Sequence, residues 1–216
     1  MGIAASSVTK FRRLALLALA LCVLPASLAS RADASDSSLL GCNYAQAERP
    51  FLRFLDPLPY ILAPEGEFER GASAWQLAGG AKVVSGNESF YLGGIGAKSL
   101  QIPSGGSATS PPMCVGLVLP VVRFVSIGGS LLASLKVEAV YTDTSGKQRS
   151  IELPAVLPSD SWQPTLQLLQ LGGVLNALTL NGLTTQMSFR FTPRAGLFGS
   201  GTWKIDAVYV DPWKTI

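Results

Sequence analysis

The feature that most constrains this chain is its punctuation from Phe68 onward. Short runs rich in Val, Leu, Ile, Phe and Tyr alternate with clusters of Gly, Ser, Asn and Pro. Such clusters mark turns, and runs of this length and composition are typical of β-strands. The pattern predicts strands at 81–84, 98–102, 113–119, 134–142, 149–153, 165–171, 186–192 and 202–210.

Several of these runs alternate with a period of two. In 135–141, Leu135, Val137, Ala139 and Tyr141 share one face, as expected for a half-buried strand. The turn residues of 143–146 then predict a hairpin. With no alternating helices, the pattern predicts an all-β, two-sheet antiparallel β-sandwich, with a jelly roll as the leading topology.

The stretch 166–183 leaves an alternative open, because its leucines also have helical spacing. The pair Gly172-Gly173 lies in its middle, and two glycines cost a helix up to about 2 kcal/mol. A strand to Leu171 followed by a turn or a short helix is therefore preferred.

The first 34 residues have the three zones of a secretory signal peptide. A basic stretch precedes an apolar run, 14–24, and small residues close the segment at Ala34. The run is shorter than the roughly 20 residues that span a bilayer, which favours cleavage over the alternative of an uncleaved anchor. We expect a secreted or envelope-associated protein with no transmembrane helix in the mature chain.

Cleavage after Ala34 changes the charge balance. It removes four of the 17 basic residues and one of the 14 acidic residues, leaving 13 of each. A neutral chain without a basic block gives no electrostatic case for binding nucleic acid or anionic lipid. Neutral partners are expected instead.

Residues 35–65 form a proline-rich extension ahead of the predicted sandwich at 66–216. Cleavage would leave Cys42 and Cys114, an even pair in an oxidising compartment, and we expect them to form a disulfide that ties the extension to the core. Such a link stabilises a fold by about 4 kcal/mol on the chain-entropy model. Two free thiols are the alternative.

Short motifs carry a family resemblance. Phe68-Glu69-Arg70-Gly71 with the following Trp75, the segment Trp162-Gln163-Pro164-Thr165, and the run 203–210 resemble strands of galactose-binding-like jelly rolls, a pattern shared by many carbohydrate-binding modules. The cysteine pair and Asp211-Pro212-Trp213 are also similar to a group of small secreted actinobacterial proteins. The resemblance implies the fold more than any activity.

The same resemblance implies a structural calcium ion. Glu69 and Asp206 match the positions from which such jelly rolls supply calcium ligands, although Ala207 stands where a second acidic residue is frequent. Loop oxygens near 86–88 could complete the six to eight ligands that calcium takes. Ordinary surface charges, or an ion pair with Lys204 or Arg70, are the alternative, and no other cofactor is expected.

The chain contains no histidine, the commonest general base and metal ligand. A pair of carboxylates could still hydrolyse glycosides, with Glu65, Glu67, Glu69 and Glu88 as candidates, but their polar surroundings predict ordinary acids. We expect no catalytic residue and no enzyme, and a glycoside hydrolase ranks third among the functions.

Aromatic rings are the remaining route to function, because flat rings stack on sugar faces. Tyr91, in a Gly-rich loop, Trp213, beyond the last strand, and Trp75 are the candidate ligand-binding residues, and Trp162, Trp203 and Tyr209 are further aromatics of interest. The strand-start positions of Trp75, Trp162 and Trp203 favour core or rim packing as the alternative. The first hypothesis is a non-catalytic module for neutral carbohydrate. The alternative is a cell-surface structural or protein-interaction domain with a cell-envelope protein as its partner.

Overall fold

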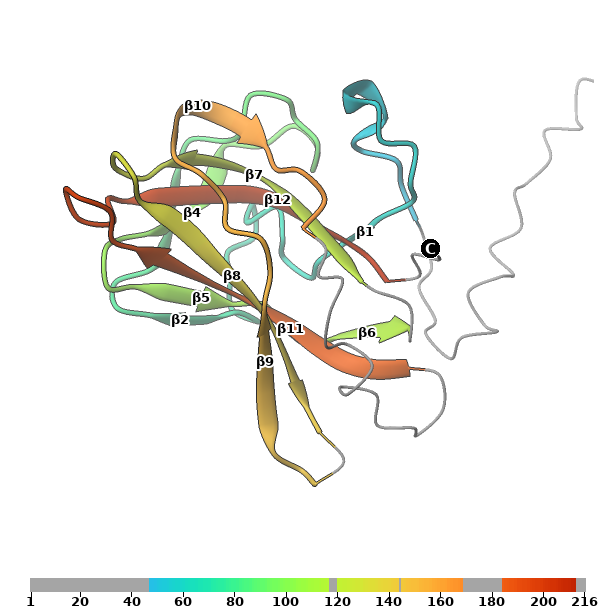
Figure 1. The fold of residues 1–216 in the computed structure, drawn as a ribbon. Coiled ribbons are helices and arrows are strands. Elements are labelled where there is room, and N and C mark those ends of the chain that lie inside the picture. The colour runs from blue at the N-terminus through green and yellow to red at the C-terminus, as the bar shows by residue number, and fades with distance from the viewer. Residues whose placement is uncertain (1–46, 117–119, 144, 169–183, 213–216) are drawn as a thin grey trace, which may run out of the picture. The chain divides into compact units, whose positions relative to one another are not determined.

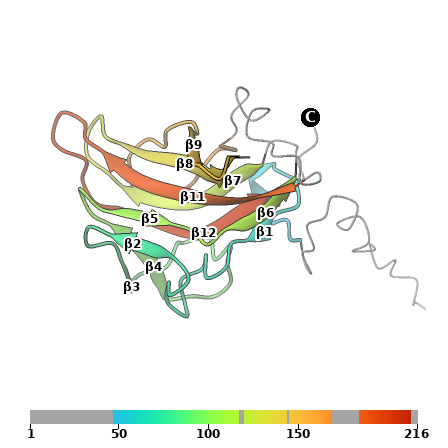
Figure 2. The same ribbon diagram turned by 90° about the horizontal axis from the view of Figure 1, so that it is seen from below.

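The protein forms a two-layered β-sandwich in a computed structural model that describes residues 47–116, 120–143, 145–168 and 184–212, all within the unit Ala34–Ile216 (Figures 1 and 2). Every strand pair is antiparallel. The all-β, two-sheet prediction is confirmed. Among the described residues, no helix has the length and apolar content to cross a membrane.

The first sheet has the strand order β10-β7-β12-β4-β3, with β1 paired to β12. Its strands are β1 Ile61–Leu62, β3 Lys82–Ser85, β4 Lys98–Ile102, β7 Val121–Gly128, β10 Ser159–Pro164 and β12 Trp203–Asp211. The second sheet has the order β2-β5-β11-β8-β9, with β6 paired to β11. Its strands are β2 Gln76–Ala78, β5 Ser107–Thr109, β6 Met113–Gly116, β8 Ser134–Thr142, β9 Gln148–Glu152 and β11 Thr184–Arg194.

The main core lies between the sheets. The alternation of polar and apolar residues along β8 places the apolar residues of this strand in the core. Leu135, Val137 and Ala139 are buried, whereas Lys136 and Glu138 face outward. From the other sheet, Phe124 meets Phe191 edge to face with ring centroids 5.1 Å apart. The period of two therefore decides which face of the second sheet meets solvent.

The strand β7 carries no alternating pattern and was not predicted. Its first six residues are all buried, because both faces of the strand are covered. One face meets the main core, and the other packs under the extension, where Phe51 and Tyr60 join Val121, Val125 and Tyr209 in a second apolar cluster. A strand buried on both faces shows no hydrophobic alternation, so the sequence pattern that reveals β8 is absent here.

The strand predicted at 165–171 is wrong over its described residues, 165–168. Residues 165–167 are irregular and Leu168 forms only an isolated bridge to Val122, while the strand β10 ends at Pro164. Proline removes a backbone donor, which is tolerated because β10 is the edge strand of its sheet. The choice between strand and helix for the rest of 166–183 is not tested, because 169–183 lie outside the described residues, as do 1–46.

The described part of the extension, 47–65, crosses the outer face of the first sheet. It contains the single 3₁₀ turn η2 Leu52–Phe54 and then β1, in which Ile61 lies opposite Val210 of β12. The extension therefore adds to the sheet as well as covering it. Cys114 lies on β6, but Cys42 is outside the described residues, so the disulfide stays a prediction, as does the signal peptide.

Candidate functional site

Two of the acidic residues singled out in the sequence analysis meet at a bulge in β12. The pairing of β12 with β7 shifts register between Asp206 and Tyr209, and Ala207 within that shift has φ of 48°. Asp206 accepts hydrogen bonds from the backbone N–H groups of Ala207, at 2.8 Å, and of Glu88, at 3.0 Å. The bulge thus holds the buried Asp206 against the loop that carries Glu88.

Glu88 is itself buried, and its carboxylate organises the loop beyond it. It accepts hydrogen bonds from the backbone N–H groups of Phe90 and Leu92. Within the described residues, neither Glu88 nor Asp206 forms an ion pair with Lys or Arg. Two buried carboxylates therefore rely on backbone donors alone for stabilisation of their charge.

Glu69 lies close enough to act on Asp206 electrostatically. Its carboxylate accepts hydrogen bonds of 2.8 Å from the backbone N–H groups of Ala97 and Lys98. A Cβ atom added to Gly96 would lie 2.5 Å from both the Glu69 Oε1 atom and the Asn87 Oδ1 atom. Two side-chain oxygens from separate segments therefore converge beside Gly96.

These surroundings change the acidity of Asp206. Burial raises its pKa to about 7, the two backbone hydrogen bonds oppose that rise, and the negative charges of Glu88 and Glu69 add to it. The donor chemistry, carboxylates and an amide oxygen, suits a hard cation such as calcium. No group of three or more His, Cys, Asp or Glu side chains in the described part of the chain is arranged to hold a metal ion, so loop oxygens would have to supply the remaining ligands.

Of the two predicted aromatic ligand residues that the structure describes, Tyr91 and Trp75, Tyr91 is the one at the surface. Its side chain is 56% exposed and its φ is 55°. It lines an open hollow of about 490 Å³ together with Arg49, Pro50, Leu52, Arg53 and Leu92. This hollow offers one ring and two guanidinium groups to a ligand.

Trp75 is a core residue and cannot stack on a sugar. Its ring packs against Phe68, with centroids 5.0 Å apart, and against Phe191, and its indole N–H donates to the Pro64 carbonyl at 2.9 Å. Trp203 is buried and Trp162 packs at the edge of the second cluster, as their strand-start positions favoured, and Tyr209 is buried as well. Trp213 lies outside the described residues.

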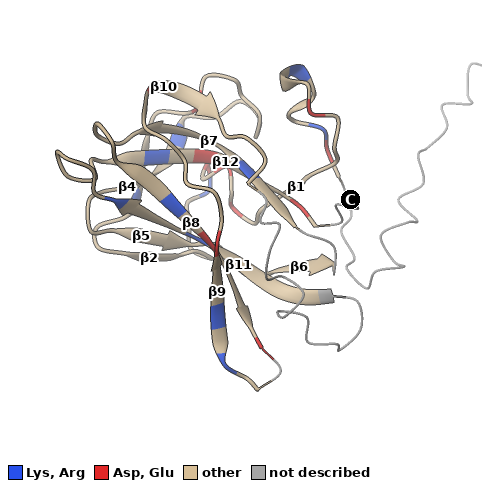
Figure 3. Ribbon diagram, viewed as in Figure 1, with Lys and Arg blue, Asp and Glu red and all other residues tan. Residues whose placement is uncertain are grey.

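A polar groove on the outer face of the second sheet was not anticipated as a site. It encloses about 460 Å³ over β2, β5, β8 and β11, and no aromatic side chain lines it among the described residues. The side chains that offer hydrogen bonds there are Gln76, Ser107, Thr109, Lys136, Glu138, Arg190 and Thr192. Figure 3 shows charged positions along β8, on the sheet that carries the groove.

The charged groups of this groove are held in place by their neighbours. Lys136 Nζ lies 2.8 Å from the Glu138 carboxylate, which also accepts a hydrogen bond from Ser150 Oγ at 3.2 Å, and Arg190 Nε donates to Thr109 Oγ1 at 3.4 Å. Burial acts to raise the pKa of Glu138, but the hydrogen bond and charge of Lys136 outweigh it and keep that pKa below its ordinary value. The groove therefore presents an ionised acceptor beside fixed cationic donors.

The acids proposed for glycoside hydrolysis do not assemble in this groove, where Glu138 is the one carboxylate among the described lining residues. Hydrogen bonds from the Ala74 backbone N–H and the Ser73 hydroxyl hold the pKa of Glu65 below its ordinary value, which is the opposite of what a general acid needs. Glu65 is therefore not prepared to act as a general acid.

The groove residues could have been found from the sequence only in part. The alternation of β8 already places Lys136 and Glu138 on the outer face, and Met187 to Phe191 places Arg190 on the opposite face from its buried neighbours. What the sequence lacks is the pairing of β8 and β5 on either side of β11. That pairing sets Glu138 and Thr109 beside Arg190.

The sequence matches no known family model and no curated protein. Among solved structures, the chain is similar to the Clostridium thermocellum N-terminal endo-1,4-β-D-xylanase 10B, CBM22-1 and GH10 modules complexed with xylohexaose, with 11% identity, a TM-score of 0.51 and coverage of 71% of this chain and 28% of that one. The CBM22-1 xylan-binding domain of Paenibacillus barcinonensis Xyn10C has 17% identity, a TM-score of 0.48 and coverage of 70% and 94%. TmCBM61 in complex with β-1,4-galactotriose has 19% identity, a TM-score of 0.41 and coverage of 70% and 99%. At these identities the likeness concerns architecture, and the chain has a jelly-roll β-sandwich fold of the kind found in carbohydrate-binding modules.

Proposed function

We propose that this protein is a non-catalytic, exported module that binds neutral carbohydrate in the polar groove of its second sheet. The observation that carries the proposal is the juxtaposition of Arg190, Glu138 and Lys136 with hydroxyl and amide side chains on one open sheet face. Export rests on the signal-like segment 1–34, and a neutral ligand agrees with the balanced charge of residues 35–216.

The chemistry of the groove matches a polyhydroxylated ligand. Each sugar hydroxyl is both a donor and an acceptor, and the groove offers both kinds of partner: Glu138 and the threonine hydroxyls accept, while Arg190 and Lys136 donate. Because Lys136 pairs with Glu138, that part of the groove carries no net charge. Hydrogen bonds to groups fixed on strands give orientation at little entropic cost, which suits a chain molecule lying along a sheet.

The solved structures supply the first ligands to try. Their names record xylohexaose, xylan and β-1,4-galactotriose. Xylohexaose and β-1,4-galactotriose are both uncharged oligosaccharides rich in hydroxyl groups.

Isothermal titration calorimetry with xylohexaose and β-1,4-galactotriose tests the proposal. We expect binding of at least one of them, and Arg190→Ala should weaken it about tenfold or more, because a hydrogen bond from a charged donor contributes about 1.5–3 kcal/mol. Glu138→Gln should have a similar effect. Tyr91→Ala is the matched control and should leave the affinity unchanged.

Two results would contradict the assignment. Absence of heat with both oligosaccharides and with soluble xylan argues against carbohydrate binding. Loss of affinity in Tyr91→Ala with none in Arg190→Ala would move the site to the Tyr91 hollow.

We also propose that calcium binds beside Gly96, with Glu69 and Asp206 as its carboxylate ligands and Asn87 as a neutral one. The support is the convergence of the Glu69 and Asn87 oxygens and the electrostatic coupling of Glu69 to Asp206. A divalent cation there would stabilise carboxylates that otherwise have only backbone donors.

Thermal unfolding with and without a chelator tests this site. At a calcium concentration about one hundred times Kd, the melting temperature should rise by roughly 5–10 °C over the chelated protein. Glu69→Gln should remove most of that rise, and magnesium should not reproduce it, because magnesium demands a tighter octahedral site. Equal melting temperatures with calcium and with chelator would refute the site.

A further inference from the structure

One end of the sandwich exposes an unusual number of large apolar side chains. They lie on three loops, 129–133, 153–158 and 195–202, and each is between 63% and 75% exposed: Leu131, Leu132, Leu157, Leu197 and Phe198. We call these five residues the apolar tip. Single exposed leucines are ordinary on protein surfaces, but a cluster of this kind marks an interaction site.

The loops that carry the apolar tip are packed against one another. A Cβ atom added to Gly196 would lie 2.3 Å from the backbone nitrogen of Ala133, and one added to Gly129 would lie 2.8 Å from the Pro158 side chain. Ser130 Oγ donates a hydrogen bond to the Gly199 carbonyl. The five side chains therefore project from one joined backbone surface rather than from independent loops.

The backbone is also set to display these side chains outward. Gly196 and Gly199 form an isolated bridge with a 2.9 Å hydrogen bond, which places Leu197 and Phe198 at the apex of a tight turn. Leu132 has φ of 60°, a left-handed conformation that costs a leucine free energy. Backbone strain at a residue whose apolar side chain is exposed is typical of functional sites.

The loops that carry the apolar tip contain no charged residue, and the exposed ion pair of Arg194 and Glu152 flanks two of them. None of the residues in the three loops, or in the adjoining loop 103–106, is Asp, Glu, Lys or Arg. Ser104 of that fourth loop joins the group through a 2.7 Å hydrogen bond from Ser200. The corresponding loops in Figure 3 are uniformly uncharged. The apolar tip therefore favours an apolar partner, because its loops offer no charge and the flanking ion pair is neutral overall.

The size and shape of the apolar tip favour a lipid bilayer over a protein. Five side chains at these exposures present on the order of 600 Å², below the roughly 800 Å² that each partner buries in a stable protein interface. The five residues line neither of the two hollows described above, and they project from turns. A projecting surface needs a matching hollow in a protein partner, whereas lipid chains rearrange around it.

We propose that the apolar tip inserts into the interface of a neutral lipid bilayer, an attachment that goes beyond carbohydrate binding. Leu197 and Phe198 at the turn apex enter first, and Leu131, Leu132 and Leu157 follow at the rim. The polar groove lies on the outer face of the second sheet, so a protein held by its loops could still bind a glycan there.

The test uses the full chain and vesicles of phosphatidylcholine. Phe198→Trp introduces a tryptophan at the apex, and its emission should shift to shorter wavelength and be quenched by brominated lipid when vesicles are added. Ile95→Trp, which changes a 96% exposed apolar residue outside the apolar tip, is the matched control and should show neither effect. Both signals are measured relative to the unmodified protein, which already has four tryptophans.

Vesicle flotation supplies the second readout. Changing both Leu197 and Phe198 to Ser should lower the fraction of protein that floats with the vesicles at least tenfold relative to the unmodified protein. Changing the exposed Leu55 and Ile95 to Ser should leave that fraction unchanged. Binding should persist in 0.5 M salt and need no anionic lipid, because the tip is uncharged. Equal quenching at positions 198 and 95, binding that requires anionic lipid, or a concentration-dependent dimer abolished by the Leu197 and Phe198 changes would each overturn the proposal.

Discussion

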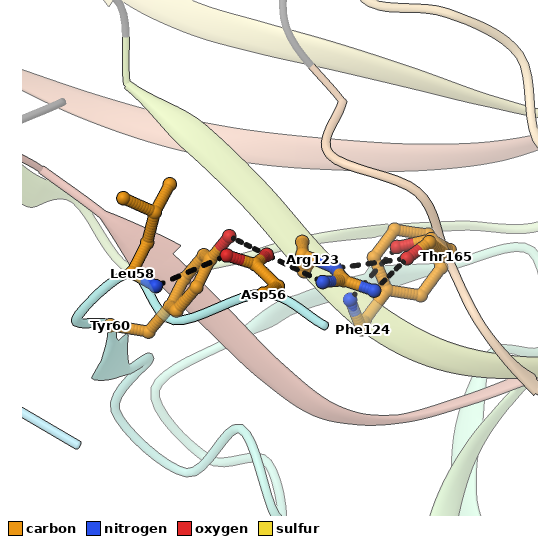
Figure 4. A network of polar contacts seen from close by, with 6 residues as sticks. All are labelled: Asp56, Leu58, Tyr60, Arg123, Phe124 and Thr165. Carbon is orange, nitrogen blue, oxygen red and sulfur yellow. Dashed lines mark hydrogen bonds and ion pairs between the residues drawn. The ribbon is translucent and has the colours of Figure 1, made fainter. Parts of the chain in front are cut away.

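Asp56→Asn is expected to destabilise the protein by about 3–5 kcal/mol, because it leaves the buried Arg123 guanidinium without its counter-charge. Asp56 and Arg123 form an ion pair of 2.5 Å, and both side chains are about 5% exposed. Figure 4 shows the pair at the centre of a network that joins the extension to β7 and to the segment after β10.

The neighbours of this pair explain why it tolerates burial. Arg123 donates from Nε and Nη2 to the Thr165 carbonyl, at 2.9 and 2.6 Å, and its guanidinium lies 4.0 Å from the Phe51 ring centroid. The Tyr60 hydroxyl donates to Asp56 at 2.6 Å. Burial acts to raise the pKa of Asp56, but the hydrogen bonds from Tyr60, Gln167 and Arg123 outweigh it and hold that pKa below its ordinary value.

Urea unfolding followed by fluorescence measures this effect, and two variants make the result specific. Adding Arg123→Met to Asp56→Asn should recover much of the lost stability, because the orphaned charge is gone. The exposed pair of Glu152 and Arg194 is the control, and Glu152→Gln should cost under about 1 kcal/mol. An Asp56→Asn variant as stable as the Glu152→Gln variant would show that the extension does not depend on this network.

In the presence of a chelator, the protein is expected to lose stability between pH 4 and pH 7 through Asp206. Burial raises the pKa of this group in the folded protein to about 7, against an ordinary value of 3.8. Between these values the folded state keeps a proton that the unfolded state has released, so folding takes up a proton and stability falls as pH rises. The difference corresponds to about 4 kcal/mol over the whole window.

Comparison of the unfolding free energy of wild type and Asp206→Asn at pH 4, 5, 6 and 7 isolates this contribution. The slope of the wild-type curve should be more negative than that of the variant, whatever the absolute stability of the variant, since asparagine keeps only one of the two acceptor oxygens. Replacing the exposed Asp160 by Asn should leave the slope unchanged. Parallel curves for wild type and Asp206→Asn would mean that Asp206 is ionised in the folded protein throughout this range.

Local patterns predicted the architecture best in strands whose polar and apolar residues alternate, as they do in β8. The strands 98–102 and 134–142 were predicted with the bounds that β4 and β8 have. In β8 the period of two along 134–139 directly records burial on one side. The strand β7 was not predicted, because a strand that is covered on both faces shows no alternation of polar and apolar residues. The short strands β1, β2 and β5, of two or three residues each, are too brief to carry a pattern.

The candidate sites could also be predicted from the sequence only in part. The resemblance to galactose-binding-like jelly rolls implied a cation site at Glu69 and Asp206, and in the fold Asp206 lies close enough to Glu69 and Glu88 to feel the charge of both. The aromatic residues gave less guidance, because a ring can serve a core or a ligand equally well, and Trp75 serves the core. Exposure is a property of the whole packing, which no local sequence window contains.

The sequence by itself determined that this chain forms antiparallel sheets, which faces of β8 and β11 are apolar, and that histidine chemistry is excluded. These follow from composition and from the periodicity of single strands. Only the tertiary structure decided that Arg190 lies beside Glu138 and Thr109, that Arg123 is buried against Asp56, and that three uncharged loops gather their leucines at one end. Each of these joins residues far apart in the chain, and their proximity is fixed by strand order and register, which the local pattern does not specify.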